Sequence, residues 1–287
     1  MSRPLPTHPF FHELGKVSVT NIREEVDRTD LELLAVDCYG TKRPEQAYRT
    51  VRRGQYTHLY TAVSHVGQFV GLQSNNDEVT REHKPYTLPL STRKIKLYLN
   101  QKENHARLFH LVVKAKTGTL DKAELMPAKI LVAPRYLAPP RWFLSEIAQT
   151  PEEDYESKSK LRHANGTRLL STGEAHALQQ GTFTDNTSDA LYLLNAIPSI
   201  LTGNFFQDQS IHAIFSYRNT TGIQSFSDQR IGPFPNAGVT AGVRRYSHRF
   251  NSYVLEETLN NRAGPNNATV REVVQGMRNW TINRRYA

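Results

Sequence analysis

Alternation of apolar and polar positions is the strongest pattern in this chain, and it is clearest between Ser91 and Lys116. Apolar side chains recur at every second residue in two runs, at Ile95, Leu97 and Leu99 and then at Phe109, Leu111, Val113 and Ala115. A period of two is typical of strands that are buried on one face. The pattern therefore predicts an antiparallel hairpin whose turn is the polar segment 101–104. Its outer face would be basic and would carry Lys94, Lys96, Lys114 and Lys116.

Further strands are predicted at 129–133, 190–197 and 211–218 from short apolar or alternating runs. The segment 56–73 is rich in Tyr, Thr, Val and Phe and fits a strand pair or one long bent strand. Residues 22–34 fit a helix, or a helix followed by a strand. A charged helix is expected after Thr150 and Pro151, and a final helix after Thr269, because Glu272 completes a capping box there.

These elements predict three parts of the chain. Residues 1–20 contain Pro4, Pro6 and Pro9 and are expected to form an extended arm. Residues 21–220 would form a β-rich core with a helical insertion near 141–165. Residues 221–287 would form an arginine-rich extension that ends in a helix. The expected fold is mainly β within the α+β class, as an antiparallel β-sandwich with extended arms at both ends.

The charge distribution adds an expected partner. The chain of 287 residues has a formal net charge of +9 and a pI near 9.6, which favours an anionic partner. All twelve lysines lie at or before Lys160, and from residue 200 onward the chain contains ten arginines but only five carboxylates. Arginine presents a planar fork that matches phosphate oxygens and also stacks on bases. Ordinary surface composition is the alternative explanation.

Arginine alternates with aromatic residues in two segments near the C-terminus. Arg244, Arg245 and Arg249 neighbour Tyr246 and Phe250, and Arg284 and Arg285 follow Trp280. Such segments suit single-stranded nucleic acid, because rings stack on bases while guanidinium groups hold phosphates. Alternatively, the aromatic side chains anchor the extension to the core or to another subunit. The candidate nucleic-acid-binding residues are these five arginines together with Lys94 and Lys96.

Motifs for catalysis are missing from the sequence. It contains no phosphate-binding GxxxxGK[ST] loop, no GxGxxG, no GxSxG and no HExxH. The spacings of His58 with His65 and of His105 with His110 suit neither a helical metal site nor one face of a strand. The single cysteine, Cys38, lies in an apolar run and excludes a disulfide framework. We therefore expect no catalytic residue, metal or cofactor, and a protein that is not an enzyme.

No apolar stretch approaches the roughly 20 residues that cross a bilayer, and the N-terminus has no secretory apolar region. We therefore expect neither membrane insertion nor secretion.

The order of three segments resembles a known viral family. LFHLVVKAKTG, SDALYLLNAIPS and QSIHAIFSYR, within residues 90–220, are similar to strands of the single jelly-roll capsid proteins of small single-stranded DNA viruses, geminivirus-like ones in particular. The resemblance implies a jelly-roll sandwich whose subunits assemble side by side around a genome. It also implies a virion protein that passes through the host cytoplasm or nucleus during assembly.

Three functions are compatible with these observations. The leading hypothesis is a viral capsid or nucleocapsid subunit that assembles with itself into a shell or filament and contacts nucleic acid. The second is a viral movement or accessory protein that binds nucleic acid without forming a shell. The third is an enzyme without a short motif, which would use scattered residues such as Asp37, Tyr56, His58 or His65.

Overall fold

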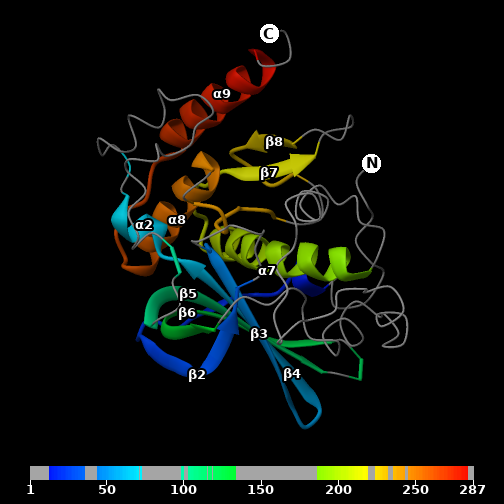
Figure 1. The fold of residues 1–287 in the computed structure, drawn as a ribbon. Helices are drawn as coiled ribbons and strands as arrows, with labels where there is room; N and C mark the ends of the chain where they lie inside the picture. The colour runs from blue at the N-terminus through cyan, green and yellow to red at the C-terminus, as the bar shows by residue number, and fades with distance from the viewer. Residues whose placement is uncertain are drawn as a thin grey trace. The chain divides into compact units, whose positions relative to one another are not determined.

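The fold is given by a computed structural model of the chain (Figure 1). It describes residues 13–35, 44–70, 72, 98–99, 103–114, 116–117, 119–133, 186–218, 224–231, 235–242 and 245–283. The elements, in chain order, are β1 (Thr20–Asn21), β2 (Val26–Leu34), β3 (Gln46–Arg53), β4 (Tyr56–Ser64), α2 (Val66–Phe69), β5 (Glu103–Lys114), β6 (Leu120–Ala133), α7 (Asn186–Asp208), β7 (Phe215–Arg218), β8 (Gln224–Ser227), α8 (Tyr246–Leu259) and α9 (Asn267–Asn283).

The chain divides into two compact units. One contains residues 6–64 and 98–198, and the other contains residues 1–5, 65–97 and 199–287. The predicted division into an arm, a core and an extension stays a prediction. The mixed α+β class is confirmed, whereas a jelly roll is not.

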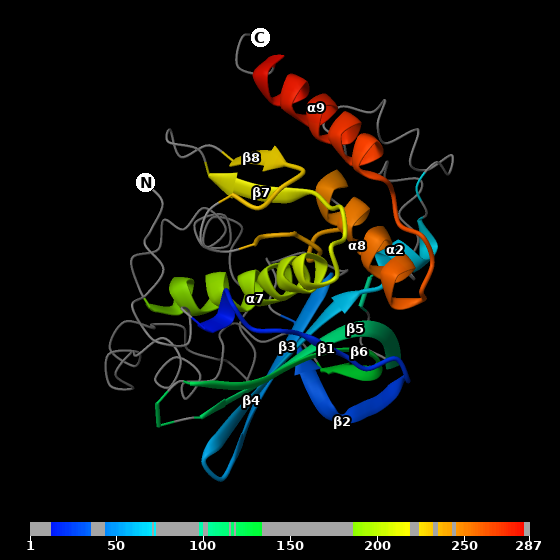
Figure 2. The ribbon, with the colours of Figure 1, turned by 180° about the vertical axis from the view of Figure 1, so that it is seen from behind.

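Five strands of the first unit close into a barrel. The hydrogen-bonded order is β1-β6-β2-β3-β4-β5, and β5 pairs with β6 as well, which closes the ring (Figure 1). Strand β6 is the longest, with 14 residues, and uses both of its edges. One edge pairs antiparallel with β5, and the other pairs parallel with β1 at Glu124 and Leu125 and then with β2 from Ala128 onward. Figure 2 shows β1 beside β6 from behind.

The barrel interior is filled by alternate residues of its strands. They form one apolar cluster that includes Leu31, Leu33, Ala47, Tyr60, Ala62, Leu108, Met126, Ala128, Ile130 and Val132. Strands β3 and β4 are joined by a two-residue turn in which Gly54 has φ +60°, a backbone conformation that glycine adopts at little cost. In β2, the five steps from Arg28 to Leu33 match only two steps in β6, from Ile130 to Val132. This bulge places Arg28 and Leu33 both beside interior residues of β6, although they are five positions apart and would lie on opposite faces of a regular strand.

Several sequence predictions agree with these elements. Residues 109–114 lie in β5, residues 129–133 end β6, and the predicted final helix is α9. The cap of α9 differs from the prediction, because Asn266 Oδ1 accepts hydrogen bonds from the backbone N–H of Thr269 at 2.9 Å and from its hydroxyl at 3.1 Å.

Other predictions are wrong. Residues 103–104 belong to β5 and not to a hairpin turn, and β5 pairs with β4 and β6. Both alternating sets of β5 side chains are buried, so its outer face is not solvated and basic. Segment 26–34 is a strand, because the apolar positions Leu31 and Leu33 fit a period of two. Predicted elements at 91–97 and 141–165 lie outside the described residues.

The strand predicted at 190–197 is also wrong, because these residues belong to α7, a helix of 23 residues. Its buried apolar residues Ile197, Ile200, Leu201 and Phe205 follow the spacing of one helical face. Similarly, only the last four residues of the predicted strand 211–218 form β7.

The second unit is packed closely around α8. Helix α2 lies against α8 so tightly that a Cβ atom on Gly67 would be 2.3 Å from the carbonyl oxygen of Ser252. Nearby, the backbone at Gly238 approaches the ring of His248, and a Cβ atom there would be 2.4 Å from Nε2. These approaches leave no space for any side chain.

Substitution Gly67→Ala should therefore lower the free energy of unfolding by about 1–3 kcal/mol, because the backbone of α2 or α8 must move to admit the methyl group. The matched control is Gly264→Ala, whose new Cβ would meet only Val254 Cγ1 at 4.0 Å. The control should change stability by less than about 0.5 kcal/mol. Urea unfolding followed by circular dichroism measures both, and equal stabilities of the two variants would contradict the close contact.

Candidate nucleic-acid interface

The predicted arginine segment lies at the start of α8. Arg245 is the N-cap residue, with an extended backbone, and its side chain is exposed. Its backbone N–H donates to the carbonyl of Ala241 at 2.8 Å, and its carbonyl accepts the first helical bond, from Arg249 N–H, at 3.1 Å. Sequence analysis did not predict this helix, because its preceding loop is rich in Gly, Pro and Asn. The positions of Tyr246, Phe250 and Val254, four residues apart and all buried, are the signal that could have indicated it.

Polar side chains of α8 hold the loops around it in place. Asn251 is fully buried, accepts a hydrogen bond from the N–H of Ile214 at 3.0 Å, and donates to the carbonyls of Ile214 at 2.8 Å and Gly238 at 3.2 Å. His248 Nδ1 accepts from the N–H of Ala241 at 3.0 Å, which places its ring proton on Nε2. Side chains of α8 thus hold Gly238 and Ala241, which precede the helix.

Arg249 differs from Arg245 because it is buried, with 2% of its surface exposed. Its guanidinium carbon lies 5.1 Å from the centroid of the Tyr246 ring, a cation–π arrangement within α8. A contact of Arg249 with nucleic acid stays a prediction. The other candidates, Lys94, Lys96, Arg244, Arg284 and Arg285, lie outside the described residues.

Further arginines of the second unit are occupied by protein partners. Arg262 pairs with Glu257 at 2.9 Å and Arg271 pairs with Asp228 at 2.8 Å. Arg278 Nε donates to the carbonyl of Phe226 at 2.8 Å, which ties α9 to β8. The contacts of Arg271 and Arg278 connect α9 to β8 and to the residue that follows it, whereas the Arg262 pair lies at the end of α8; the charges of Arg262 and Arg271 are each paired with a carboxylate.

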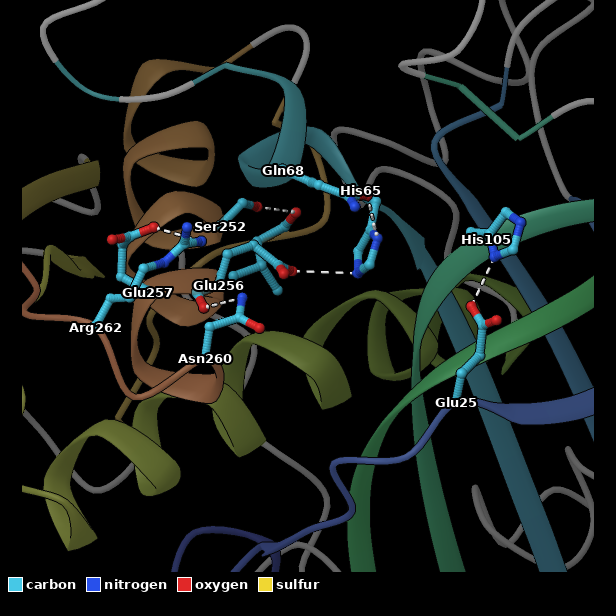
Figure 3. Close-up of polar contacts among 10 residues, drawn as sticks. Glu25, His65, Gln68, His105, Ser252, Glu256, Glu257, Asn260 and Arg262 are labelled. Carbon is cyan, nitrogen blue, oxygen red and sulfur yellow. Dashed lines mark hydrogen bonds and ion pairs between the residues drawn. The ribbon is translucent and has the colours of Figure 1, made fainter.

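Histidines that were considered for catalysis lie in separate places. His65 precedes α2 and is buried, with Nε2 3.2 Å from Glu256 and Nδ1 3.0 Å from Gln68 (Figure 3). His105 is exposed and its Nδ1 lies 2.6 Å from Glu25 (Figure 3). As the spacing predicts, His105 and His110 lie on opposite faces of β5. Tyr56 begins β4, and Asp37 lies outside the described residues.

Sequence reasoning missed a polar row inside the barrel. Cross-strand pairing places Tyr60, His110 and Glu124 side by side on β4, β5 and β6. The rings of Tyr60 and His110 stack with centroids 4.4 Å apart, and His110 Nδ1 lies 2.9 Å from Glu124 Oε2. His58 Nδ1 lies 3.0 Å from His110 Nε2. Only the register of three strands brings these residues together.

Burial determines the charge of this row. It lowers the pKa of His110 to about 4, against the opposing effect of the Glu124 carboxylate. Burial by itself raises the pKa of Glu124, but hydrogen bonds from Lys122 and His110 hold it below its ordinary value. At neutral pH His110 is therefore neutral and Glu124 is a carboxylate, which also accepts a bond from Lys122 Nζ at 2.7 Å.

Within the parts of the chain that the structure describes, no group of three or more His, Cys, Asp or Glu side chains could hold a metal ion. In the same parts, no helix is long and apolar enough to cross a membrane.

Comparison with known proteins gives a fold but no family. No family model matches the chain, and no curated protein matches it. Among solved structures, RNase R of Mycoplasma genitalium in complex with ribose-methylated single-stranded RNA matches with a TM-score of 0.65 and 12% identity, over 90% of this chain and 56% of that one. An active-site mutant, D477N, of the exoribonuclease Dss1 from Candida glabrata matches with a TM-score of 0.66 and 9% identity, over 93% and 47% of the two chains.

Yeast Ssd1, described as a pseudonuclease, is similar as well, with a TM-score of 0.60 and 11% identity over 97% of this chain and 44% of that one. The chain thus spans about half the length of these three proteins. At such identities the likeness shows the fold alone.

These matches correct several predictions. The resemblance to jelly-roll capsid proteins is wrong, because the fold is that of exoribonuclease-like proteins. A capsid or nucleocapsid function and a place in a virion are wrong for the same reason, since the similar proteins are two ribonucleases and a pseudonuclease. The prediction of a protein that is not an enzyme is contradicted by the exoribonucleases RNase R and Dss1. A shell of identical subunits has no support in these structures.

The state of His110 can be tested by the pH dependence of stability. Between pH 6.5 and 4 the unfolded chain takes up a proton on this ring and the folded barrel does not. Stability should therefore fall as the pH falls through this window, by at most about 3 kcal/mol from this residue. The variant His110→Gln should lose that part of the pH dependence.

The matched control is His105→Gln, which changes a histidine on the exposed face of the same strand and leaves His110 in place. Urea unfolding midpoints at several pH values between 7 and 4.5 measure the effect. Parallel profiles for the wild type and His110→Gln would show that the ring is not kept neutral by the fold.

Proposed function

We propose that this protein binds single-stranded RNA, with the loop and first turn of α8 as a principal contact. The observation that carries the proposal is the likeness of nearly the whole chain to a fold that is seen with single-stranded RNA in RNase R. The net charge of +9 supports it, because a basic surface attracts a polyphosphate chain.

The geometry at Arg245 supports this contact. Arg245 is exposed at the N-terminus of a helix of 14 residues, where the helix dipole favours an anion. Asn251 and His248 hold Gly238 and Ala241 in place by hydrogen bonds, so a phosphate bound beside these residues would meet a preformed surface. A rigid contact loses less entropy on binding than a flexible one.

The remaining candidate residues extend the proposal. Arg244 adjoins Arg245 in sequence, and Arg284 and Arg285 follow α9. With Lys94 and Lys96 they would supply further phosphate contacts. Buried Arg249 supports the site by packing against Tyr246, the first residue of α8.

Turnover of RNA is a separate property. The similar proteins include two exoribonucleases and one pseudonuclease, so this fold occurs with and without nuclease activity. Incubation of labelled single-stranded RNA with the full chain, with and without a divalent cation, tests turnover. Stepwise shortening of the RNA on a denaturing gel would show that the protein has exoribonuclease activity as well as RNA binding.

Replacement Arg245→Gln should weaken binding of single-stranded RNA about five- to tenfold at roughly 0.1 M salt, because one phosphate contact is lost. The slope of log affinity against log salt should also fall by about 0.7. Fluorescence anisotropy of a labelled RNA of mixed sequence, with chelator present, measures both quantities.

The matched control is Arg262→Gln, which removes an exposed arginine of the same unit whose charge is paired with Glu257. Its affinity should remain within twofold of the wild type. A wild-type protein that binds no RNA would overturn the proposed function, and equal effects of the two variants would remove Arg245 from the interface.

A further inference from the structure

The polar row continues to the end of the barrel at the β3–β4 turn. Beyond the layer of Tyr60, His110 and Glu124, the next interior positions are His58 on β4 and Lys122 on β6, both directly opposite Val112 of β5. His58 is half-buried, and the Lys122 side chain is about half exposed, at 52%. This end of the barrel therefore has polar side chains that reach solvent.

The Glu124 carboxylate determines which nitrogen of each histidine in this row donates a hydrogen bond and which accepts one. The Glu124 carboxylate only accepts, so His110 carries its proton on Nδ1. Neutral His110 then accepts at Nε2, and His58 must donate to it from Nδ1. The second nitrogen of His58, Nε2, is consequently an unprotonated acceptor, and it has no hydrogen-bond partner among the described residues.

Two guanidinium groups lie close enough to influence this acceptor. Burial, then the charges of Arg53 and of Arg28, lower the pKa of His58. Arg28 acts in the same way on His110 and lowers the pKa of Tyr60 against the effect of burial. In the strand register Arg28 lies beside the interior residue Ile130, and Arg53 is two residues along β3 from Val51, the partner of His58.

Arg28 has a buried hydrogen-bond donor that lacks an acceptor among the described residues. Its Nε atom is buried and has no hydrogen-bond partner in the described part of the chain. A buried donor on a cation is costly when unpaired, and a bound anion would satisfy it. Among the described residues of this row's surroundings, Lys122 is paired with Glu124, which leaves Arg28 and the exposed Arg53 as cations for a ligand.

A ligand for this end of the barrel needs an anionic group for the guanidinium groups and, close to it, a hydrogen-bond donor for His58 Nε2. The RNA backbone has both in every unit, because each phosphodiester adjoins a ribose 2′-hydroxyl. The DNA backbone has the anion without the donor. The combination therefore suits a ribonucleotide unit.

We propose that Arg28, Arg53 and His58 form a binding site for one ribonucleotide unit of RNA, with the phosphate on the two guanidinium groups and the 2′-hydroxyl donating to His58 Nε2. This site rests on the proposed function and deepens it, because it selects RNA over DNA. His110 and Glu124 are positioning residues, which fix the ring and tautomer of His58.

Matched oligonucleotides test the site. The full chain is titrated, with chelator present, with labelled single-stranded RNA, with the 2′-deoxy strand and with the 2′-O-methyl strand of the same sequence. The wild type should bind RNA about fivefold or more tightly than either modified strand, as expected for one hydrogen bond of about 1 kcal/mol. In His58→Phe, which keeps a ring and loses the acceptor, the three affinities should become equal.

Two further variants separate the roles of the groups. Arg28→Gln should weaken RNA and 2′-deoxy strands by the same factor, because both contain the phosphate. His58→Gln keeps a donor for His110 and an acceptor for the hydroxyl, so it should retain part of the preference for RNA. It also serves if His58→Phe does not fold, as judged by thermal unfolding.

The outcomes distinguish this site from the proposed function. A wild-type protein that binds none of the strands overturns the proposed function. Binding of RNA with no preference over the modified strands, or a preference that survives in a folded His58→Phe, overturns the site alone. Equal losses for RNA and DNA in His58→Phe place the contact on a base or phosphate and overturn the role of the hydroxyl.

Discussion

Closure of the barrel through β6 is the constraint on which the first unit depends. This strand pairs with β5 along one edge and with β1 and β2 in succession along the other. By contrast, β2 and β3 are joined at a single register position, Leu34 with Tyr48. A closed barrel has no free edge, so its interior residues cannot slip in register without disturbing every strand. That is why residues as distant in sequence as His58 and Glu124 keep a fixed relation.

The second unit uses a different device, a helix that is both central and polar. Buried amide, imidazole and hydroxyl groups of α8 are costly unless each finds a partner. Asn251 meets this requirement with backbone groups of two separate loops. These hydrogen bonds fix the positions of the two loops. An apolar helix would bury surface against the loops without fixing their positions in this way. An exposed arginine at the start of such a helix has a fixed place relative to the loops.

Sequence patterns predicted those elements whose signal is local. The alternation in 109–114, the short apolar run 129–133 and the helix near Thr269 belong to this kind, and they correspond to parts of β5, β6 and α9. The run 190–197 was ambiguous, because a short apolar segment fits a strand and a buried helix equally well. The polar row was beyond prediction, since His58, His110 and Glu124 meet only through pairing of three strands. The false resemblance to capsid proteins had the same origin, because apolar strands of similar length occur in many folds.

Close backbone contact in the second unit has an evolutionary consequence. Similar solved structures share only about a tenth of their residues with this chain, so the fold accepts change at most side chains. It cannot accept a Cβ atom where one backbone touches another, as at Gly67 beside Ser252 and at Gly203 beside Pro235. Drift in sequence should therefore be slowest at positions that contribute no side chain at all. Distant relatives with this fold should therefore share such glycines more often than they share charged residues.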